Sequence, residues 1–372
     1  MIRVTVVRAL VLTVALAAVA LATVAVPVRC LAQDGQTQGK RPESEKPLPA
    51  KATKELPPAL LALLQEKRMP KHSPILLRVF KEEAELEVWK QDAGGRFQLL
   101  KTFPICRWSG DLGPKFHEGD RQAPEGFYTV TPALMNPHSN YHLAINTGFP
   151  NSFDKANGRA GSLLMIHGDC ASAGCFAMTD EQIGEIYALA RDALVGRPWF
   201  QVQAYPFRLT PANLARHRNS PNLPFWTMLK IGNDHFETTQ REPRVDVCDR
   251  RYVFDAKPLP NASSPPVFDP VGKCPPFAVD PTVARAALEK QRADAAEVAR
   301  LVGRLAADGV PAAPIYTGLD GGMNERFRAR YFGWVIPLSK VMPYASHLPK
   351  LPPIPWVDND GSLASKWFGT AF

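Results

Sequence analysis

Runs of alternating apolar and polar residues dominate the first half of the chain, and such runs are typical of strands. Three of them, Ile75 to Phe80, Glu85 to Trp89 and Phe97 to Cys106, predict paired strands, with a turn at Asp92 to Gly95. Shorter apolar runs predict further strands at 127–130, 142–146, 163–166 and 202–206.

Helical signals are fewer. Thr179 and Gln182 form a capping-box pattern, and the apolar residues that follow recur on one helical face. Residues 280–309 predict a second long helix, with Asp280 as its cap and Gly309 at its end. A short apolar run at 60–64 predicts a small helix. The second long helix is expected to pack on the rest of the protein through Val298, Leu301, Val302 and Leu305.

Proline is the outlier in the composition of this 372-residue chain. Its 36 residues are roughly twice the usual share, which excludes a mostly helical architecture and predicts many turns. The elements together predict a mostly β, α+β fold. Residues 33–73 are expected to form a polar, flexible linker with a short helix. Residues 256–372 are expected to form a Pro-rich extension, helical at 280–309 and otherwise irregular.

Residues 1–32 have the pattern of a secretory signal peptide. Arg3 and Arg8 precede an uncharged run from Ala9 to Val26, and a small-residue cleavage site ends at Ala32. An uncleaved membrane anchor is the alternative, because this 18-residue run approaches spanning length. In both cases we expect the remainder to be exported to the periplasm, with contact to the membrane only through an uncleaved signal segment.

Export changes both the charge and the cysteine count. Residues 1–32 contain three arginines and no acidic residue, so the formal charge falls from +8 to +5. They also contain Cys30, so an odd number of cysteines remains. Two disulfides and one free thiol are the simplest arrangement in an oxidising compartment. The remaining cysteines are Cys106, Cys170, Cys175, Cys248 and Cys274.

The densest chemistry lies between Leu163 and Met178. An apolar strand delivers His167, and Cys175 follows eight residues later. Eight extended residues span up to about 27 Å, so the loop must fold back for the two side chains to meet. Small residues such as Gly168 and Gly174 permit that reversal. A thiol beside an imidazole is an activated nucleophile, and the turned backbone and the following helix are expected to help stabilise negative charge.

Other interpretations of these residues remain open at this point. Cys175 is equally well explained as a buried structural cysteine beside an unrelated histidine. His167, Cys170 and Cys175 also offer three ligands to zinc, although their spacing matches no standard structural site. A disulfide between Cys170 and Cys175 is a third alternative.

The motif around Cys175 resembles the active-site signature of the L,D-transpeptidase catalytic domain (the YkuD type). The tighter match is to the YafK-like murein L,D-transpeptidases, which share the short His-to-Cys spacing. Further blocks agree in order over about residues 74–255. They are Pro104-Ile105-Cys106, Ser109-Gly110, Gly113-Pro114-Lys115, Gly119-Asp120, Ala123 to Tyr128, Ala144 to Asn146, Gly148 to Asn151, Asn157 to Arg159 and Tyr205 to Arg208.

The resemblance implies an L,D-transpeptidase-type β-sandwich over residues 74–255, with a helix after the nucleophile. It implies Cys175 as nucleophile and His167 as base, while Ser172 and Gly174 shape the catalytic loop. The implied reaction is acyl transfer from diaminopimelate of a peptidoglycan stem peptide through a Cys thioester, in crosslinking or remodelling of the cell wall. It requires no metal or cofactor, and no nucleic-acid partner is expected.

One departure from the family concerns substrate recognition. Many relatives carry an arginine two residues after the cysteine, whereas this chain has Ala177. We expect Arg121 and Arg159, together with Gly168, to bind substrate instead, because a guanidinium can hold a carboxylate bidentately. Solvated loop arginines are the alternative. His142 is interpreted as structural.

If Cys175 must stay reduced, the resemblance also bears on the other cysteines. We favour the pairs Cys106–Cys170 and Cys248–Cys274, because the second pair is close in sequence and the first would staple the catalytic loop. The alternative makes Cys170 a resolving partner that protects Cys175 by oxidation.

Two further functions compete with transpeptidation. The same site would serve a hydrolase that detaches a murein-linked lipoprotein or peptide, with that lipoprotein as a second partner. A non-enzymatic murein-binding module would instead use the +5 charge on an anionic polymer.

Overall fold

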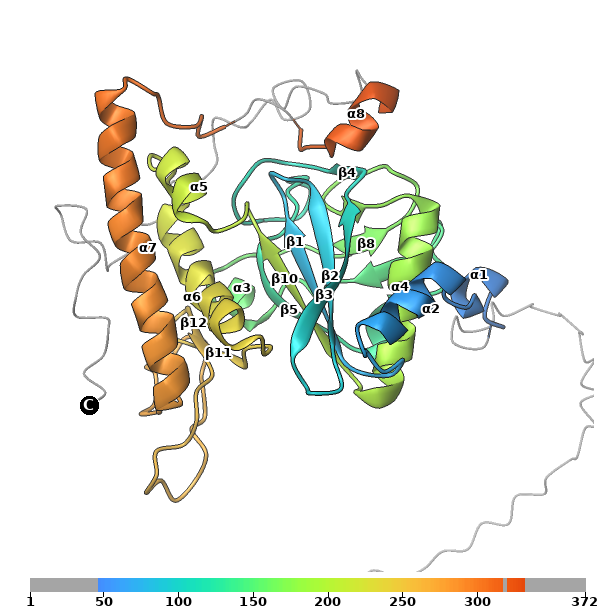
Figure 1. Cartoon of the computed structure of the whole chain (residues 1–372), viewed down its shortest axis with the longest axis horizontal. Coiled ribbons are helices and arrows are strands. Elements are labelled where there is room, and N and C mark those ends of the chain that lie inside the picture. Colours follow the sequence, from blue (N-terminus) through green and yellow to red (C-terminus); the bar gives the residue numbers. More distant parts are fainter. Residues whose placement is uncertain (1–45, 317–319, 332–372) are drawn as a thin grey trace, which may run out of the picture. The chain divides into compact units, whose positions relative to one another are not determined.

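The structure is a computed structural model that describes residues 46–316 and 320–331. The chain divides into two units, residues 1–47 and 48–372, and every labelled helix and strand of Figure 1 belongs to the second. The predicted signal segment, residues 1–32, lies outside the described residues. Among the helices described, none has the length and apolar character needed to cross a membrane.

The first sheet is five-stranded and mostly antiparallel. Its central strand β1 runs parallel to β10, and its other neighbouring pairs are antiparallel. In spatial order the strands are β3 (Phe97–Pro104), β2 (Glu85–Gln91), β1 (Ile75–Phe80), β10 (Phe200–Tyr205) and β5 (Gly126–Val130).

The second sheet is also five-stranded but is built from very short strands. Its strands β8 and β9 are parallel neighbours; β8 ends at His167, and β9 begins directly after Cys175. In spatial order the strands are β4 (Arg107–Trp108), β9 (Phe176–Ala177), β8 (Met165–His167), β7 (Ala144–Asn146) and β6 (Met135–Asn136). A 3-10 turn at Pro132–Leu134 precedes β6.

Helices surround this pair of sheets. The longest are α4 (Asp180–Gly196), α6 (Leu223–Thr239) and α7 (Pro281–Ala307). The shorter ones are α1 (Ala50–Thr53), α2 (Pro58–Glu66), α3 (Ser152–Ala156), α5 (Pro211–Arg216) and α8 (Glu325–Tyr331), and a separate hairpin joins β11 (Val245–Cys248) to β12 (Arg251–Phe254).

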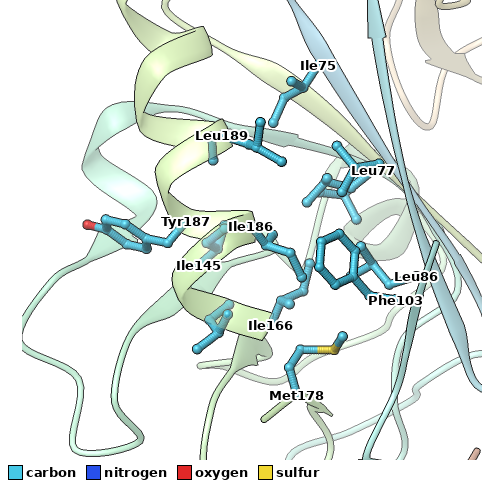
Figure 2. Packing of buried hydrophobic residues seen from close by; sticks show 14 of the residues in the cluster. Ile75, Leu77, Leu86, Phe103, Ile145, Ile166, Met178, Ile186, Tyr187 and Leu189 are labelled. Atoms are coloured by element: carbon cyan, nitrogen blue, oxygen red, sulfur yellow. The ribbon is translucent and has the colours of Figure 1, made fainter. Parts of the chain in front are cut away.

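The main hydrophobic core lies between the two sheets and α4. Figure 2 shows Leu77 and Phe103 of the first sheet facing Ile166 of the second, with Ile186 of α4 beside them. All four are buried. Helix α4 is fixed at its start by the expected capping box, in which the Thr179 and Gln182 side chains each bond the other's backbone N–H. The core thus holds the second sheet, and with it the candidate reactive residues, against the first.

The predicted fold class is confirmed as a mixed α+β structure rich in β-strands. The strands predicted at 75–80, 85–89 and 127–130 are present. The strand expected at 97–106 is shorter than predicted. Strand β3 ends at Pro104, and the next strand, β4, begins at Arg107 in the other sheet. Proline lacks an N–H for further ladder bonds, so the chain crosses between sheets there. Likewise, β8 starts at Met165 because Leu163 has a left-handed backbone, with φ 53°.

The described C-terminal residues, 209–316 and 320–331, form more helices and strands than the sequence indicated, and the remainder of the predicted extension lies outside the described residues. Between β10 and α7 the chain forms α6 and the β11–β12 hairpin. Helix α7 begins as predicted, with the Asp280 carboxylate accepting from the Thr282 N–H at 3.0 Å. It packs along α5 and α6 (Figure 1), as its apolar stripe predicted. Helix α8 was not predicted.

The expectation of a flexible linker is wrong for residues 50–56. Helix α1 packs on α4, and Ala52 and Leu56 are buried in the main core. The Arg191 guanidinium of α4 donates to the backbone carbonyls of Ala52 and Lys54 at 3.0 Å each. The predominantly polar composition concealed this segment, because only Ala52 and Leu56 provide its buried apolar contacts and the bonds to Arg191 use main-chain oxygens.

We expect Leu77→Ala to lower the free energy of unfolding by about 2–5 kcal/mol, because it opens a cavity in the main core. Leu77 is fully buried, whereas Val195 of α4 is 72% exposed. The matched control Val195→Ala should change stability by less than about 0.5 kcal/mol. Denaturant unfolding measures both, and similar costs for the two variants would contradict the described packing.

Candidate active site

The pairing of β8 with β9 brings Cys175 and His167 to one side of the second sheet. The strands pair Ile166 with Phe176 and His167 with Ala177, so Cys175 lies beside Met165. The Met165 N–H indeed donates to the Cys175 Sγ at 3.4 Å. Side chains two residues apart in a strand share a face. Strand geometry therefore separates the Cα atoms of His167 and Cys175 by about 8 Å, a distance that a thiol and an imidazole can bridge.

A chain of hydroxyl groups holds the loop before the nucleophile. The Ser172 Oγ accepts from the Cys175 N–H at 3.1 Å and donates to the Cys175 carbonyl at 2.7 Å. It also lies 3.0 Å from the Ser109 Oγ, which accepts from the Gly174 N–H. This confirms that Ser172 bonds the loop backbone. The turned backbone was expected to help stabilise negative charge, but the N–H groups of Gly174 and Cys175 both donate to these hydroxyls.

Gly174 is required by backbone conformation. Its φ is +119°, and an added Cβ would approach the Leu164 side chain to 3.2 Å. Residues with a side chain rarely adopt this conformation. The glycine therefore allows the chain to turn directly into Cys175.

The His167 ring is held in one tautomer. Its Nδ1 lies 2.6 Å from the Gly168 carbonyl oxygen, so Nδ1 carries the hydrogen and Nε2 keeps its lone pair. Burial lowers the pKa of His167 below its ordinary value of 6.5. The Tyr141 ring covers the imidazole with 4.8 Å between centroids. The imidazole is thus neutral and able to accept a proton at Nε2.

Gly168, expected to bind substrate, contacts the base instead. Its carbonyl accepts from His167, and its N–H donates to the Tyr141 carbonyl at 3.0 Å. An added Cβ would approach the Asp180 Oδ1 to 2.5 Å. These contacts favour a positioning role for Gly168.

The Cys175 thiol is half-buried and protonated at rest. Burial raises the pKa of the Cys175 thiol, while the Met165 N–H and the charge of Lys115 oppose that rise in part. Lys115 itself is buried and paired with Asp120. The pKa of His167 is lowered and that of Cys175 is raised, so both groups are uncharged at neutral pH.

The helix that follows the nucleophile does not support the thiolate directly. Helix α4 begins at Asp180, five residues beyond Cys175, and the Asp180 carboxylate accepts from the Asp169 N–H at 2.9 Å. The influence of a helix dipole falls off within one turn. The expected contribution of α4 to negative charge at Cys175 is therefore small.

The favoured disulfide pairing is confirmed. Cys106 forms a disulfide with Cys170, and their Cα atoms are 5.3 Å apart. Cys248 forms a disulfide with Cys274, and their Cα atoms are 5.0 Å apart. Among the described cysteines only Cys175 is free. This pairing excludes a Cys170–Cys175 bridge and removes Cys170 from the set of zinc ligands. No group of three metal-binding side chains occurs in residues 46–316 and 320–331.

The two expected substrate arginines lie in different surroundings. Arg121 is beside the catalytic loop, since its carbonyl accepts from the Ser109 Oγ at 2.8 Å. Arg159 is 7% exposed, pairs with Asp154 at 3.1 Å and stacks over the rings of Phe153 and Phe225. Its guanidinium is committed to these partners, so its contacts favour a structural role over substrate binding.

His142 lies outside the strand in which it was expected. Strand β7 starts at Ala144, and His142 precedes it with a left-handed backbone, φ 64°. Its Nδ1 is 3.5 Å from the Asp180 carboxylate. This contact agrees with its structural interpretation.

Sequence reasoning missed three contributors to the site: Ser109, Lys115 and Tyr141. Ser109 and Lys115 belong to blocks of the family resemblance, but their sequence neighbourhood gave no indication that they approach Cys175. Tyr141 lies in a loop without periodicity. Each acts on a residue that is distant from it in the chain, Lys115 through its charge.

The class of enzyme is shown by comparison with known proteins. The family profile described as "L,D-transpeptidase catalytic domain" (YkuD) matches residues 79–203, which include His167 and Cys175. "Putative L,D-transpeptidase YafK" from Escherichia coli K12 is 49% identical over 188 residues, covering 50% of this chain and 76% of that protein. The same values hold for YafK of Escherichia coli O157:H7. The chain therefore belongs to the L,D-transpeptidase family, and its function is of the peptidoglycan L,D-transpeptidase type.

Solved structures give weaker likenesses. The helical cell shape determining protein Pgp2 (K307A mutant) from Campylobacter jejuni is 21% identical with a TM-score of 0.31, over 43% of this chain and 57% of that one. Bd1075 from Bdellovibrio bacteriovorus is 26% identical with a TM-score of 0.27, over 37% and 49%. Because these scores are low, the family assignment depends on the sequence matches.

We expect iodoacetamide to label Cys175 in the native, non-reduced protein, and to do so more slowly at pH 7 than it labels a small exposed thiol. Only the thiolate reacts, and burial raises the pKa of Cys175. The labelling rate should keep rising through pH 9. Peptide mapping by mass spectrometry identifies the site. Rapid labelling that is independent of pH above 6 would show a preformed thiolate and contradict the neutral pair.

The pH profile tests the base. Only neutral His167 accepts a proton, and burial lowers the pKa of His167, so the acid limb of kcat/KM should lie below pH 6.5. Activity should therefore persist at pH 6.5 and fall at lower pH as the imidazole becomes protonated. An acid limb centred above pH 6.5 would be the contrary result.

Proposed function

We propose that this protein is an exported cysteine L,D-transpeptidase that acts on peptidoglycan stem peptides, in which Cys175 is the nucleophile and His167 the base. His167 Nε2 takes the thiol proton as Sγ attacks the carbonyl carbon of the diaminopimelate residue. The tetrahedral intermediate then expels the leaving amine, which receives that proton from the imidazolium. A thioester between Cys175 and the stem peptide remains.

The second half of the reaction repeats these steps with a new amine. The acceptor amine attacks the thioester carbonyl and gives a proton to His167. The Cys175 thiolate leaves and recovers that proton, so the enzyme is regenerated and one amide has replaced another. No other co-reactant is consumed.

One observation supports this proposal most: β8 pairs His167 with Ala177 of β9, and the free Cys175 stands two residues before that alanine. The imidazole is oriented by Gly168, which leaves Nε2 as acceptor. Ser172 and Gly174 position the nucleophile's backbone rather than react. The chain thus supplies a nucleophile, a base and a loop that holds them.

Two disulfides support export, because such bonds persist mainly in oxidising compartments. The signal-like residues 1–32 agree with a periplasmic location. Cell-wall crosslinking or remodelling is the role that this location and substrate allow.

Defined muropeptides and lipoprotein-linked murein, incubated with purified protein and analysed by mass spectrometry, test the proposal. We expect crosslinked stem peptides from the wild type. We expect a loss of at least about 10³-fold in rate for Cys175→Ala, because no group replaces the nucleophile. Cys175→Ser keeps the size of the side chain and should also be strongly impaired, while the exposed control Val195→Ala should retain activity.

The products separate the competing functions. Freed lipoprotein or peptide amine would mean that water is the acceptor, and the protein would be a cysteine amidase with the same nucleophile. Equal behaviour of wild type and Cys175→Ala would exclude Cys175 chemistry and favour a murein-binding module. Thermal unfolding of each variant checks that the comparison is made between folded proteins.

A further inference from the structure

A short segment of the C-terminal extension lies against the edge of the active-site sheet. Strand β4 is the outermost strand of that sheet. The Trp108 N–H donates to the Gly322 carbonyl at 3.0 Å, and the Gly322 N–H donates to the Trp108 carbonyl at 3.1 Å. The Asn324 N–H donates to the Ile105 carbonyl at 3.2 Å. The segment Asp320 to Asn324, the docked segment, therefore pairs with β4 as an added strand would.

The docked segment carries a carboxylate into a cationic cradle. Asp320 Oδ2 accepts from the Arg121 Nε at 3.0 Å and Nη2 at 2.5 Å. Its Oδ1 accepts from the Gly110 N–H at 3.0 Å, and the Arg107 Nη2 lies 3.9 Å from Oδ2. Asp320 is 1% exposed. Two guanidinium N–H groups on one carboxylate oxygen and a backbone N–H on the other thus give Asp320 donors at both oxygens, and the guanidinium bonds are charge-assisted.

This cradle adjoins the reactive loop. Strand β4 pairs Arg107 with Ala177, and β8 pairs His167 with the same alanine. Arg107, Ala177 and His167 therefore form one row across three strands, with side chains on one face. On the loop side, the Arg121 carbonyl accepts from the Ser109 Oγ, which also accepts from the Gly174 N–H. One strand, β9, therefore separates Arg107 from His167. Two hydrogen bonds of the Ser109 hydroxyl connect Arg121 to Gly174.

We propose that Arg107, Arg121 and the Gly110 N–H form a carboxylate-binding subsite for the substrate peptide, and that Asp320 is an internal carboxylate that occupies it. This inference rests on the proposed function, since it concerns a subsite of that same active site. A substrate carboxylate enters only when the docked segment leaves. The extension then sets the apparent affinity for substrate, because the dissociation constant rises as the competent fraction falls.

The segment offers two independent ways to empty the cradle without altering the arginines. Asp320→Asn keeps the shape but removes the charge that the guanidinium fork holds. Gly321→Ala acts on the backbone, because a Cβ there would lie 1.8 Å from the Trp108 carbonyl oxygen, at a φ of +89°. The matched control is Gly303→Ala on α7, where an added Cβ meets nothing within 4 Å.

The test measures binding by calorimetry in an inactive Cys175→Ala background. The probe is a synthetic stem peptide containing diaminopimelate, in free-acid form and with its carboxylates amidated. We expect Asp320→Asn and Gly321→Ala each to tighten binding of the free acid by about tenfold, as an occluding conformation is removed. The amidated peptide should show no gain, and Gly303→Ala should leave both values unchanged. Adding Arg121→Ala should abolish the gain.

A second measurement needs no variant in the segment. In the Cys175→Ala protein, saturating free-acid peptide should speed hydrogen exchange of the Gly322 amide, which Trp108 otherwise protects. Unchanged affinity in both variants, or unchanged exchange at saturation, would overturn the subsite. Such a result would leave the proposed function standing if Cys175→Ala still abolishes turnover of murein. Loss of the Cys175 dependence alone, with the binding gains present, would overturn the proposed chemistry and not the subsite.

Discussion

The parallel pairing of β8 with β9 is the constraint on which the site depends. Parallel neighbours usually need a connection of a dozen or more residues, yet only residues 168–175 join these two strands. So short a loop must double back, and it does so through left-handed backbone at Asp169 and Cys170, with φ 68° and 47°, and at Gly174. The Cys106–Cys170 disulfide and the Ser109 and Ser172 hydroxyls hold it in that form. The reversal brings the thiol back beside the strand that carries the imidazole.

The same compact loop determines the electrostatics of the pair. Burial raises the pKa of Cys175 and lowers the pKa of His167, so both groups are neutral at rest. A neutral pair avoids the cost of keeping two charges in a poorly solvated site. Lys115, the positive group that partly opposes the rise in the thiol pKa, is itself neutralised by Asp120 and exerts only a moderate influence.

Local signals allowed much of this to be predicted from the sequence, and long-range contacts account for what was missed. The capping box at Thr179 and the cap at Asp280 depend on neighbours in the chain and are present as predicted. The candidate pair His167 and Cys175 was likewise indicated by a local motif. Two-residue strands such as β4 and β9 have no periodicity to detect, since their existence depends on partners in the same sheet. Arg159 looked like a ligand-binding arginine because its ring and carboxylate partners come from folding, not from its motif.

The described part of the C-terminal extension contacts the rest of the protein in two different ways. Helix α7 packs on α5 and α6, and Lys230 of α6 reaches its Asp294 at 2.6 Å. The docked segment instead uses backbone pairing and one carboxylate, and it does so at β4. Ser109 directly precedes Gly110, whose N–H donates to Asp320. The Ser109 hydroxyl donates to the Arg121 carbonyl and accepts from the Gly174 N–H. The edge strand therefore connects the extension to the loop before Cys175, in part through the hydrogen bonds of Ser109.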